Sequence, residues 1–282
     1  MMPLQAERKI PNPFQGQSNR GLLWNKFVST WPSLAGDSLR TFKSLRGESK
    51  TSWIKKFTSF RGERKPLERA ARRLRILAER LGGQAVAFQS TAPFVTGMGL
   101  EHPVENGFLW HHTLSAPFLP GSSVKGLIRA WAQQWEGLGE DDEDIVRILG
   151  PHMDHAEHGN AGALIFFDAL PCEPPELMTE VLTPHDGGWR NDESKIPADW
   201  NSPIPIPWLA VRDALLLFAI APRPGAHEDG AQAVADVEKV FAWLKEALEW
   251  TGAGARTAVG LGRFADAEEL EKTKRQQAKK TA

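Results

Sequence analysis

Length, composition and cysteine content exclude several classes of protein. The chain has 282 residues, of which 41% are hydrophobic, so it can bury a substantial core and is not a disordered chain. Its single cysteine, Cys172, excludes an internal disulfide framework and a zinc site built from several thiolates. No run of about 18 apolar residues is present, and residues 1–14 lack the apolar core of a secretory signal. We therefore expect a globular, cytoplasmic protein with no membrane partner.

The net charge of −1 conceals a strong asymmetry along the chain. Residues 1–80 hold 18 Lys and Arg against 6 Asp and Glu, which gives +12 and leaves −13 for residues 81–282. Clustered basic side chains gain affinity for polyanions by releasing counterions from phosphates. This pattern favours a nucleic-acid partner. A solvated basic tail and a contact to an acidic neighbouring subunit are the alternatives.

The basic part of the chain divides into an arm and a helix. Residues 1–62 mix Gly, Pro, Ser and Trp without a sustained period, which indicates an extended or partly helical arm. From Arg64 to Leu81 the spacing of apolar residues predicts an amphipathic helix with arginines on its other faces. The apolar positions are Leu67, Ala70, Leu74, Leu77 and Leu81. Gly82-Gly83 ends this helix, so residues 1–82 form the predicted basic arm and helix.

A strand, a loop and a well-marked helix follow. Gln84–Ser90 reads as a strand, Thr96–Gly107 as a glycine-containing loop and Phe108–Trp110 as a short strand. The next helix begins after Pro120-Gly121, where Ser122 or Ser123 can cap it. Its predicted apolar stripe consists of Val124, Leu127, Ile128, Trp131 and Trp135.

The second half repeats this order of elements. After an acidic linker at residues 140–144, the sequence predicts a strand at Ala163–Phe167, a proline-rich insertion at about 171–207 and a strand at Ala214–Ile220. A helix at Ala231–Trp250 and a strand at Arg263–Phe264 follow. The inward residues of this helix are expected to be Val234, Val237, Phe241, Leu244 and Leu248. The order is compatible with a βαββαβ, ferredoxin-like (RRM-like) α+β domain over residues 83–264, in which helices cover one face of the sheet. Residues 265–282 are a charged C-terminal tail.

Residues 252–263 form the first candidate binding segment. Four glycines and two arginines share twelve positions directly after a predicted helix: Gly252, Gly254, Arg256, Gly260, Gly262 and Arg263. Glycines let backbone N–H groups approach a phosphate, and arginines supply charge-assisted hydrogen bonds. A flexible turn at the helix exit is the alternative.

The second candidate segment is the start of the helix after Pro120. A helix N-terminus offers free amides and the positive end of a dipole. Hydroxyl and basic side chains lie beside it, and the candidate residues are Gly121, Ser122, Ser123, Lys125 and Arg129. A capped surface helix with solvated charges is the alternative reading.

These two segments carry a family resemblance. PFLPGSSVKGLIRAW together with GAGARTAVGLGRF resembles the paired signatures of the RAMP superfamily, the RNA-binding subunits of CRISPR effector complexes. The stretches SNRGLLWNKF, LEHPVENGFLWHHTL, EVLTPHDGGW and PIPIPWLAV are similar to the sixth-subunit family of the Cmr, or type III-B, complex. The resemblance extends from about Asn19 to Phe264.

The resemblance implies a noncatalytic backbone subunit. Such subunits bind the 3′ portion of the guide RNA, help present it to target RNA and contact other Cmr-type RAMP subunits in antiviral defence. The residues of both candidate segments, together with His111, are the expected RNA-binding set, and we expect no cofactor. Residues 177–189 would form a thumb-like projection, although Glu180 and Asp186 stand where the family leads us to expect an Asp and an aromatic residue.

Catalysis and metal binding are the weaker readings. Cleaving relatives use an Asp near the position of Glu105, and His111-His112 could act in acid–base chemistry, but neither has an evident partner. His152, His155 and His158 are spaced as metal ligands can be, yet the flanking glycines indicate a surface loop. A RAMP-type endoribonuclease and a purely structural assembly subunit therefore remain as alternatives.

Overall fold

The computed structural model describes residues 19–28, 47–59, 62–151, 161–185, 196, 198 and 200–281. The helices are α1 Arg20–Lys26, α3 Gly47–Thr58, α4 Arg64–Arg80, α5 Gly121–Gln134, α6 Glu143–Leu149, α8 Gly230–Glu246 and α9 Ala267–Thr281, with a π-helical turn at Ala247–Thr251 and a 3-10 turn at Thr257–Val259. The strands are β1 Gln84–Ser90, β2 Leu164–Phe166, β3 Leu170–Pro171, β4 Glu176–Leu182, β5 Ile206–Asp213, β6 Leu215–Pro222 and β7 Phe264–Asp266.

The main sheet is antiparallel and has the order β2-β6-β1-β7, with β3 also paired to β6. The longest pairing joins β1 to β6, from Gln84 opposite Ile220 to Gln89 opposite Leu215. The first strand, β1, therefore lies between β6 and β7, the strands that precede and follow α8 in the chain. The mixed helix and sheet architecture expected from the sequence is confirmed, and the predicted strands at residues 84–90 and 214–220 are present.

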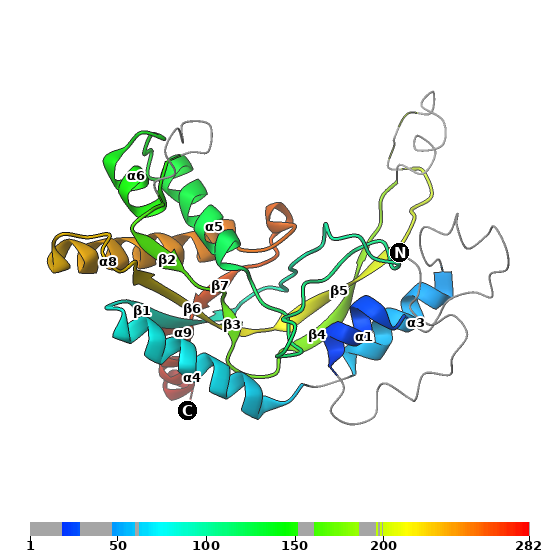
Figure 1. The fold of residues 1–282 in the computed structure, drawn as a ribbon. Coiled ribbons are helices and arrows are strands. Elements are labelled where there is room, and N and C mark those ends of the chain that lie inside the picture. The colour runs from blue at the N-terminus through cyan, green and yellow to red at the C-terminus, as the bar shows by residue number, and fades with distance from the viewer. Residues whose placement is uncertain are drawn as a thin grey trace.

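Helices cover both faces of this sheet (Figure 1). Phe88 and Phe218 pack into the core that contains α5 and α8, whereas Leu217 and Ala219 pack against Leu74 of α4. The two helices that lie within the predicted domain, α5 and α8, cover one face, and α4, which precedes that domain, covers the other. Successive residues of a strand point to opposite faces, and because β6 is apolar at almost every position, both faces need a cover.

The segment between β3 and β6 folds as a second sheet of two antiparallel strands, β4 and β5. This β4–β5 hairpin projects from one end of the main sheet beside α1 and α3 (Figure 1). The two N-terminal helices are anchored by aromatic packing, because Trp24, Trp53 and Phe57 are fully buried and join the main core. Part of the basic arm thus contributes to the core.

Three local expectations were wrong. Phe108–Trp110 is not a strand, because Trp110 forms only an isolated bridge to Pro117. The acidic linker is partly helical, since the Asp142 side chain accepts from Asp144 N–H and caps α6. Leu77, expected to face inward, is 46% exposed, because the alanines of α4 make the close contact with the sheet.

Two other expected core residues are exposed. Val234 is 50% exposed at the solvent side of α8. Trp135 is 61% exposed because α5 ends at Gln134, and its ring stacks on Trp131 at a centroid distance of 5.2 Å. Among the described residues, no helix is both long and apolar enough to cross a bilayer.

Candidate nucleic-acid interface

The start of α5 is fixed by a side chain from another element. The Gly121 N–H donates to Asp168 Oδ1 at 2.8 Å, and no serine side chain caps the helix. The predicted cap by Ser122 or Ser123 was therefore wrong, and both residues are exposed at the surface. A Cβ on Gly121 would overlap the Phe166 carbonyl oxygen, so this glycine allows the helix start to approach β2. Sequence reasoning missed Asp168, which lies two residues after the end of β2.

The loop at residues 252–263 is built on glycines with positive φ, from 72° at Gly262 to 91° at Gly254. A Cβ on Gly254 would overlap the Val95 carbonyl oxygen, and one on Gly262 would overlap the Ala253 carbonyl oxygen. Gly260 instead has no atom within 4 Å of its Cβ position. A Cβ on Gly252 would overlap the Arg263 guanidinium, so three of the four glycines allow close packing in and around the loop, whatever the loop binds.

The two arginines of this loop differ in their partners. The Arg263 guanidinium donates to the carbonyl oxygens of Thr251 at 2.5 Å, Leu261 at 3.2 Å and Thr257 at 3.2 Å, and so holds the loop closed. The Arg256 side chain has no ion pair or hydrogen bond with any described residue, and its backbone is left-handed with φ of 60°. Arg256 is thus available to an external ligand and Arg263 is engaged inside the chain.

The two candidate segments meet at one cavity of about 470 Å³. Ser123 of α5 lines it together with Gly252, Gly254 and Thr257 of the glycine loop. A third segment, residues 96–99, completes the wall and was not predicted as part of the site. The density of glycines at Gly97 and Gly99 was the available signal for it. Segments about 130 residues apart in sequence therefore share one hollow in the surface.

The wall of this cavity offers backbone donors. Within the described part of the chain, the N–H group of the lining residue Thr257 has no hydrogen-bond acceptor, and neither has that of Arg256 directly before it. Those of Ala253 and Ala255 donate to the carbonyls of Gly262 and Val95. Free amides at a glycine turn beside a basic side chain are the chemistry that binds phosphate oxygens.

The remaining predicted residues lie outside the lining of the cavity. Lys125 is half-buried, and burial together with the nearby positive charge of Arg129 lowers its pKa. Arg129 donates to the carbonyl oxygens of Leu149 at 3.1 Å and Gly150 at 2.7 Å, and so satisfies the C-terminal end of α6. This arginine is therefore engaged within the fold.

His111 belongs to a turn. Its Nδ1 accepts from the N–H groups of Thr113 and Leu114, and its ring meets Phe118 edge-on at 5.4 Å. Burial lowers the pKa of His111, although the nearby charge of Asp168 opposes this effect. These contacts hold the His111 ring in the turn before Pro117, and an RNA contact of His111 stays a prediction.

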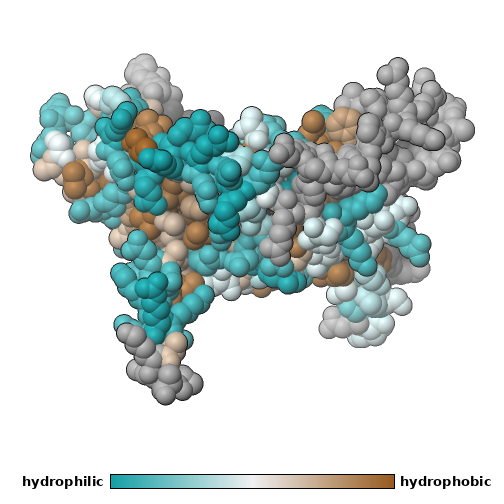
Figure 2. All heavy atoms as spheres, turned by 90° about the horizontal axis from the view of Figure 1, so that it is seen from below, coloured by the Kyte–Doolittle hydropathy of each residue, from teal (hydrophilic) through white to brown (hydrophobic). Residues whose placement is uncertain are grey.

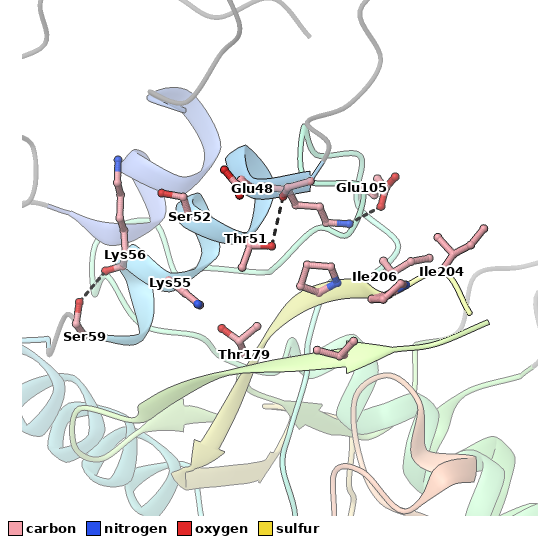
Figure 3. A pocket seen from close by; sticks show the side chains of 15 residues that line it. Glu48, Thr51, Ser52, Lys55, Lys56, Ser59, Glu105, Thr179, Ile204 and Ile206 are labelled. Carbon is pink, nitrogen blue, oxygen red and sulfur yellow. Dashed lines mark hydrogen bonds and ion pairs between the residues drawn. The ribbon is translucent and has the colours of Figure 1, made fainter. Parts of the chain in front are cut away.

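Glu105 borders a larger cleft of about 1400 Å³ between α3 and the β4–β5 hairpin (Figure 3). Its carboxylate accepts from the Lys50 ammonium, which is 3% exposed, and its backbone has φ of 72°. The described residues contain no group of three or more His, Cys, Asp or Glu side chains that could hold a metal ion. His152, His155, His158 and Asp186 lie outside the described residues.

Comparison with known proteins places these features in a family. The sequence pattern of the RAMP superfamily matches residues 88–265. The CRISPR system Cmr subunit Cmr6 of Pyrococcus furiosus is 31% identical over 133 residues, which cover 44% of this chain and 35% of that protein. The chain thus spans about a third of the length of the curated relative that it matches.

Solved structures resemble the fold. A chain in the type III-B Cmr-beta complex bound to cognate target RNA superposes with a TM-score of 0.54 and 18% identity over 87% of both chains. The crystal structure of Cmr6 from Pyrococcus furiosus gives a TM-score of 0.40 at 22% identity, over 65% of this chain and 97% of that one. The family match covers more than half of the chain and includes both signature segments, so the protein belongs to the RAMP superfamily.

Proposed function

We propose that this protein is a noncatalytic RNA-binding backbone subunit of a type III-B CRISPR effector complex. In this role it binds the 3′ portion of the guide RNA beside other Cmr-type RAMP subunits, and the guide pairs with target RNA. The likeness to Cmr6 and to a chain of a target-bound Cmr complex supports the assembly. Sequence specificity then belongs to the guide, and the protein contacts the ribose-phosphate backbone.

The observation that carries the proposal is the shared cavity of the two signature segments. Ser123, the glycine loop and residues 96–99 form one concave surface, and Lys125 and Arg256 are close in sequence to lining residues. The free N–H groups of Arg256 and Thr257 add donors that need no side-chain charge. Phosphate groups satisfy both kinds of donor, whereas a neutral ligand would leave the basic side chains without a partner.

The strand order supports a ferredoxin-like description of the domain. In the order β2-β6-β1-β7, the first strand lies between the third and the last of the four main strands, as a βαββαβ unit requires. The β4–β5 hairpin projects from this unit and is the counterpart of the thumb-like insertion. We infer that it reaches the region where guide and target RNA pair.

The noncatalytic part of the proposal rests on Glu105. A carboxylate that contributes to metal-dependent cleavage must be free to bind the ion, and Glu105 is paired with the nearly inaccessible ammonium of Lys50. The endoribonuclease alternative therefore has less support than the guide-binding role.

Affinity for guide RNA tests the proposal. Lys125→Ala and Arg256→Ala should each weaken guide binding by about 1–3 kcal/mol, the range for loss of a hydrogen bond to a charged group. Arg275→Ala is the matched control, because this exposed arginine of α9 pairs only with Glu271 among the described residues. Gly254→Val is not a suitable test variant, since its side chain would collide with the Val95 carbonyl oxygen and disturb the loop itself.

Parent-like affinity of both Lys125→Ala and Arg256→Ala, with each variant folded, would replace the guide-binding role with that of a purely structural subunit. Loss of affinity in Arg275→Ala of the same size would show that the assay reports net charge alone. Fluorescence anisotropy at one fixed salt concentration separates these outcomes, because salt itself changes the affinity for RNA.

A further inference from the structure

The outer side of α4 carries a line of basic side chains. At about 100° per residue, five exposed residues fall within roughly a third of the helix circumference, opposite the buried side that contains Leu67 and Leu74. These residues, named here the α4 stripe, are Lys65, Arg69, Arg72, Arg73 and Arg80. The acidic residues of the helix, Glu68 and Glu79, lie toward one flank, near Arg64 and Arg75.

The stripe is not neutralised by the fold. Arg64, on the flank, pairs with Glu68 and Glu173, and Arg75 donates to the Ala85 carbonyl oxygen at 2.7 Å. The five stripe residues have no ion pair or hydrogen bond with any other residue that the structure describes. An exposed row of one charge without internal partners raises the local concentration of anions.

The position and spacing of the stripe are set by the fold. Lys65, Arg69 and Arg72 follow one another at spacings of four and three residues, Arg73 is next to Arg72, and Arg80 comes two turns later, so the stripe extends along roughly 22 Å of helix. The helix is held rigidly, because Ala71, Leu74 and Ala78 pack on Leu217 and Ala219 of β6. α4 lies below the main sheet in Figure 1, and the view from below shows a broad hydrophilic area on this side (Figure 2).

The chemistry of the stripe favours a nucleic-acid backbone over an acidic protein. Protein interfaces need a desolvated core of apolar or aromatic anchors, and charged side chains are depleted there. Only Ile76 and Leu77 are large exposed apolar residues on α4, and both are partly covered. A polyphosphate needs no such core, since release of its counterions drives binding, and the guanidinium forks of arginine match phosphate oxygens.

We propose that the α4 stripe is a second RNA-binding surface, which holds a ribose-phosphate backbone on the opposite side of the main sheet from the glycine-loop cavity. This site goes beyond the proposed guide-binding role. It takes any RNA strand by its phosphates and reads no sequence. Because the sheet and its covering helices separate the two sites, a strand held at the cavity does not fill the stripe.

Charge removal on the intact chain tests the second surface. The stripe variant is Arg69→Gln, Arg72→Gln and Arg73→Gln, since glutamine keeps the side chain long and favours the helix. The matched control is Lys272→Gln, Lys274→Gln and Arg275→Gln, which removes the same charge from exposed positions of α9. The probe is a labelled polyuridine of about 20 nucleotides, together with an RNA duplex of the same length, titrated over a range of salt concentrations.

The stripe variant should bind the probe more weakly at low salt, and the slope of log affinity against log salt should fall by about 2, because three phosphate contacts contribute about 0.7 each for single strands. The α9 control should keep the parent's slope. A stripe variant with the parent's affinity and slope for both RNAs overturns the proposal. Loss of binding to polyglutamate with unchanged RNA binding also overturns it and assigns the stripe to an acidic protein.

A variant with Lys125→Ala and Arg256→Ala, titrated in parallel, separates this proposal from the guide-binding role. If only the stripe variant is impaired, the second surface stands and the glycine-loop site fails. If only the variant with Lys125→Ala and Arg256→Ala is impaired, the reverse holds. Circular dichroism of each variant confirms that α4 remains folded, so that a loss of affinity reports the surface.

Discussion

Replacing Arg263 and Arg256 one at a time should separate two roles that look identical in the sequence. Arg263 donates to three carbonyl oxygens of the glycine loop, and two of these hydrogen bonds are long at 3.2 Å. Hydrogen bonds to charged groups contribute about 1.5–3 kcal/mol, and partial exposure of this group favours the lower part of that range. Arg263→Ala should therefore lower the free energy of unfolding by about 2 kcal/mol, or the melting temperature by about 4–8 °C.

Arg256→Ala should leave the melting temperature unchanged, because its side chain has no partner among the described residues, and should weaken guide RNA binding. Arg263→Lys keeps the charge but not the planar fork, so it should recover only part of the stability. Differential scanning fluorimetry and anisotropy on the same samples give both readouts. An Arg263→Ala protein that melts like the parent yet binds RNA poorly would refute this division of roles.

Other expectations follow from the described contacts. Glu105→Ala should leave target RNA cleavage by the assembled complex at the parent's rate, because its carboxylate is committed to Lys50; a cleavage assay with labelled target checks this. Asp236 is 1% exposed, and although burial alone would raise its pKa, hydrogen bonds from Arg147, Gln232 and His227 lower it. This stabilisation is present above the carboxyl pKa of about 4 in the unfolded chain and is lost as pH falls through the lower pKa of the folded protein. The free energy of unfolding of the parent should therefore fall in acid, and Asp236→Ala should lower it by about 3 kcal/mol at neutral pH. Urea unfolding measures both effects. Burial raises the pKa of Cys172 to about 11, so its thiol should react slowly with maleimide at pH 7 until urea exposes it; rapid labelling of the folded protein would contradict the burial.

Periodicity located some of the regular elements of the fold, but not α1, α3, α6, α9 or the β4–β5 hairpin. The helices at residues 64–80 and 230–246 and the strands at residues 84–90 and 215–222 follow from apolar spacing and from glycine punctuation. Leu77 and Trp135 were predicted to be buried but are exposed. Helical periodicity gives the direction of a side chain, but it gives neither how closely the neighbouring element packs nor the residue at which the helix ends.

The chemistry of the candidate site could be predicted only in part. The sequence singled out the start of α5 and the glycine loop as candidate segments, and the fold brings both to one cavity. Whether a Lys or Arg side chain has a partner within the protein depends on tertiary contacts, which a local sequence pattern does not predict. Arg129 donates to carbonyl oxygens at the end of α6, Arg263 donates to carbonyl oxygens of its own loop, and Asp168 accepts the Gly121 N–H at the start of α5. Residues 96–99 line the cavity because the fold brings them there, and they were not predicted as part of the site.

Crosslinking of guide RNA to this subunit in the assembled complex tests the guide-binding role most directly. Photoreactive nucleotides placed along the 3′ portion of the guide, followed by mass spectrometry of the attached peptides, locate the contact on the chain. The role predicts crosslinks to the peptides that contain Ser123 and residues 252–257, and their loss with Arg256→Ala. Efficient crosslinks confined to neighbouring subunits, in particles that contain this protein in full amount, would contradict it.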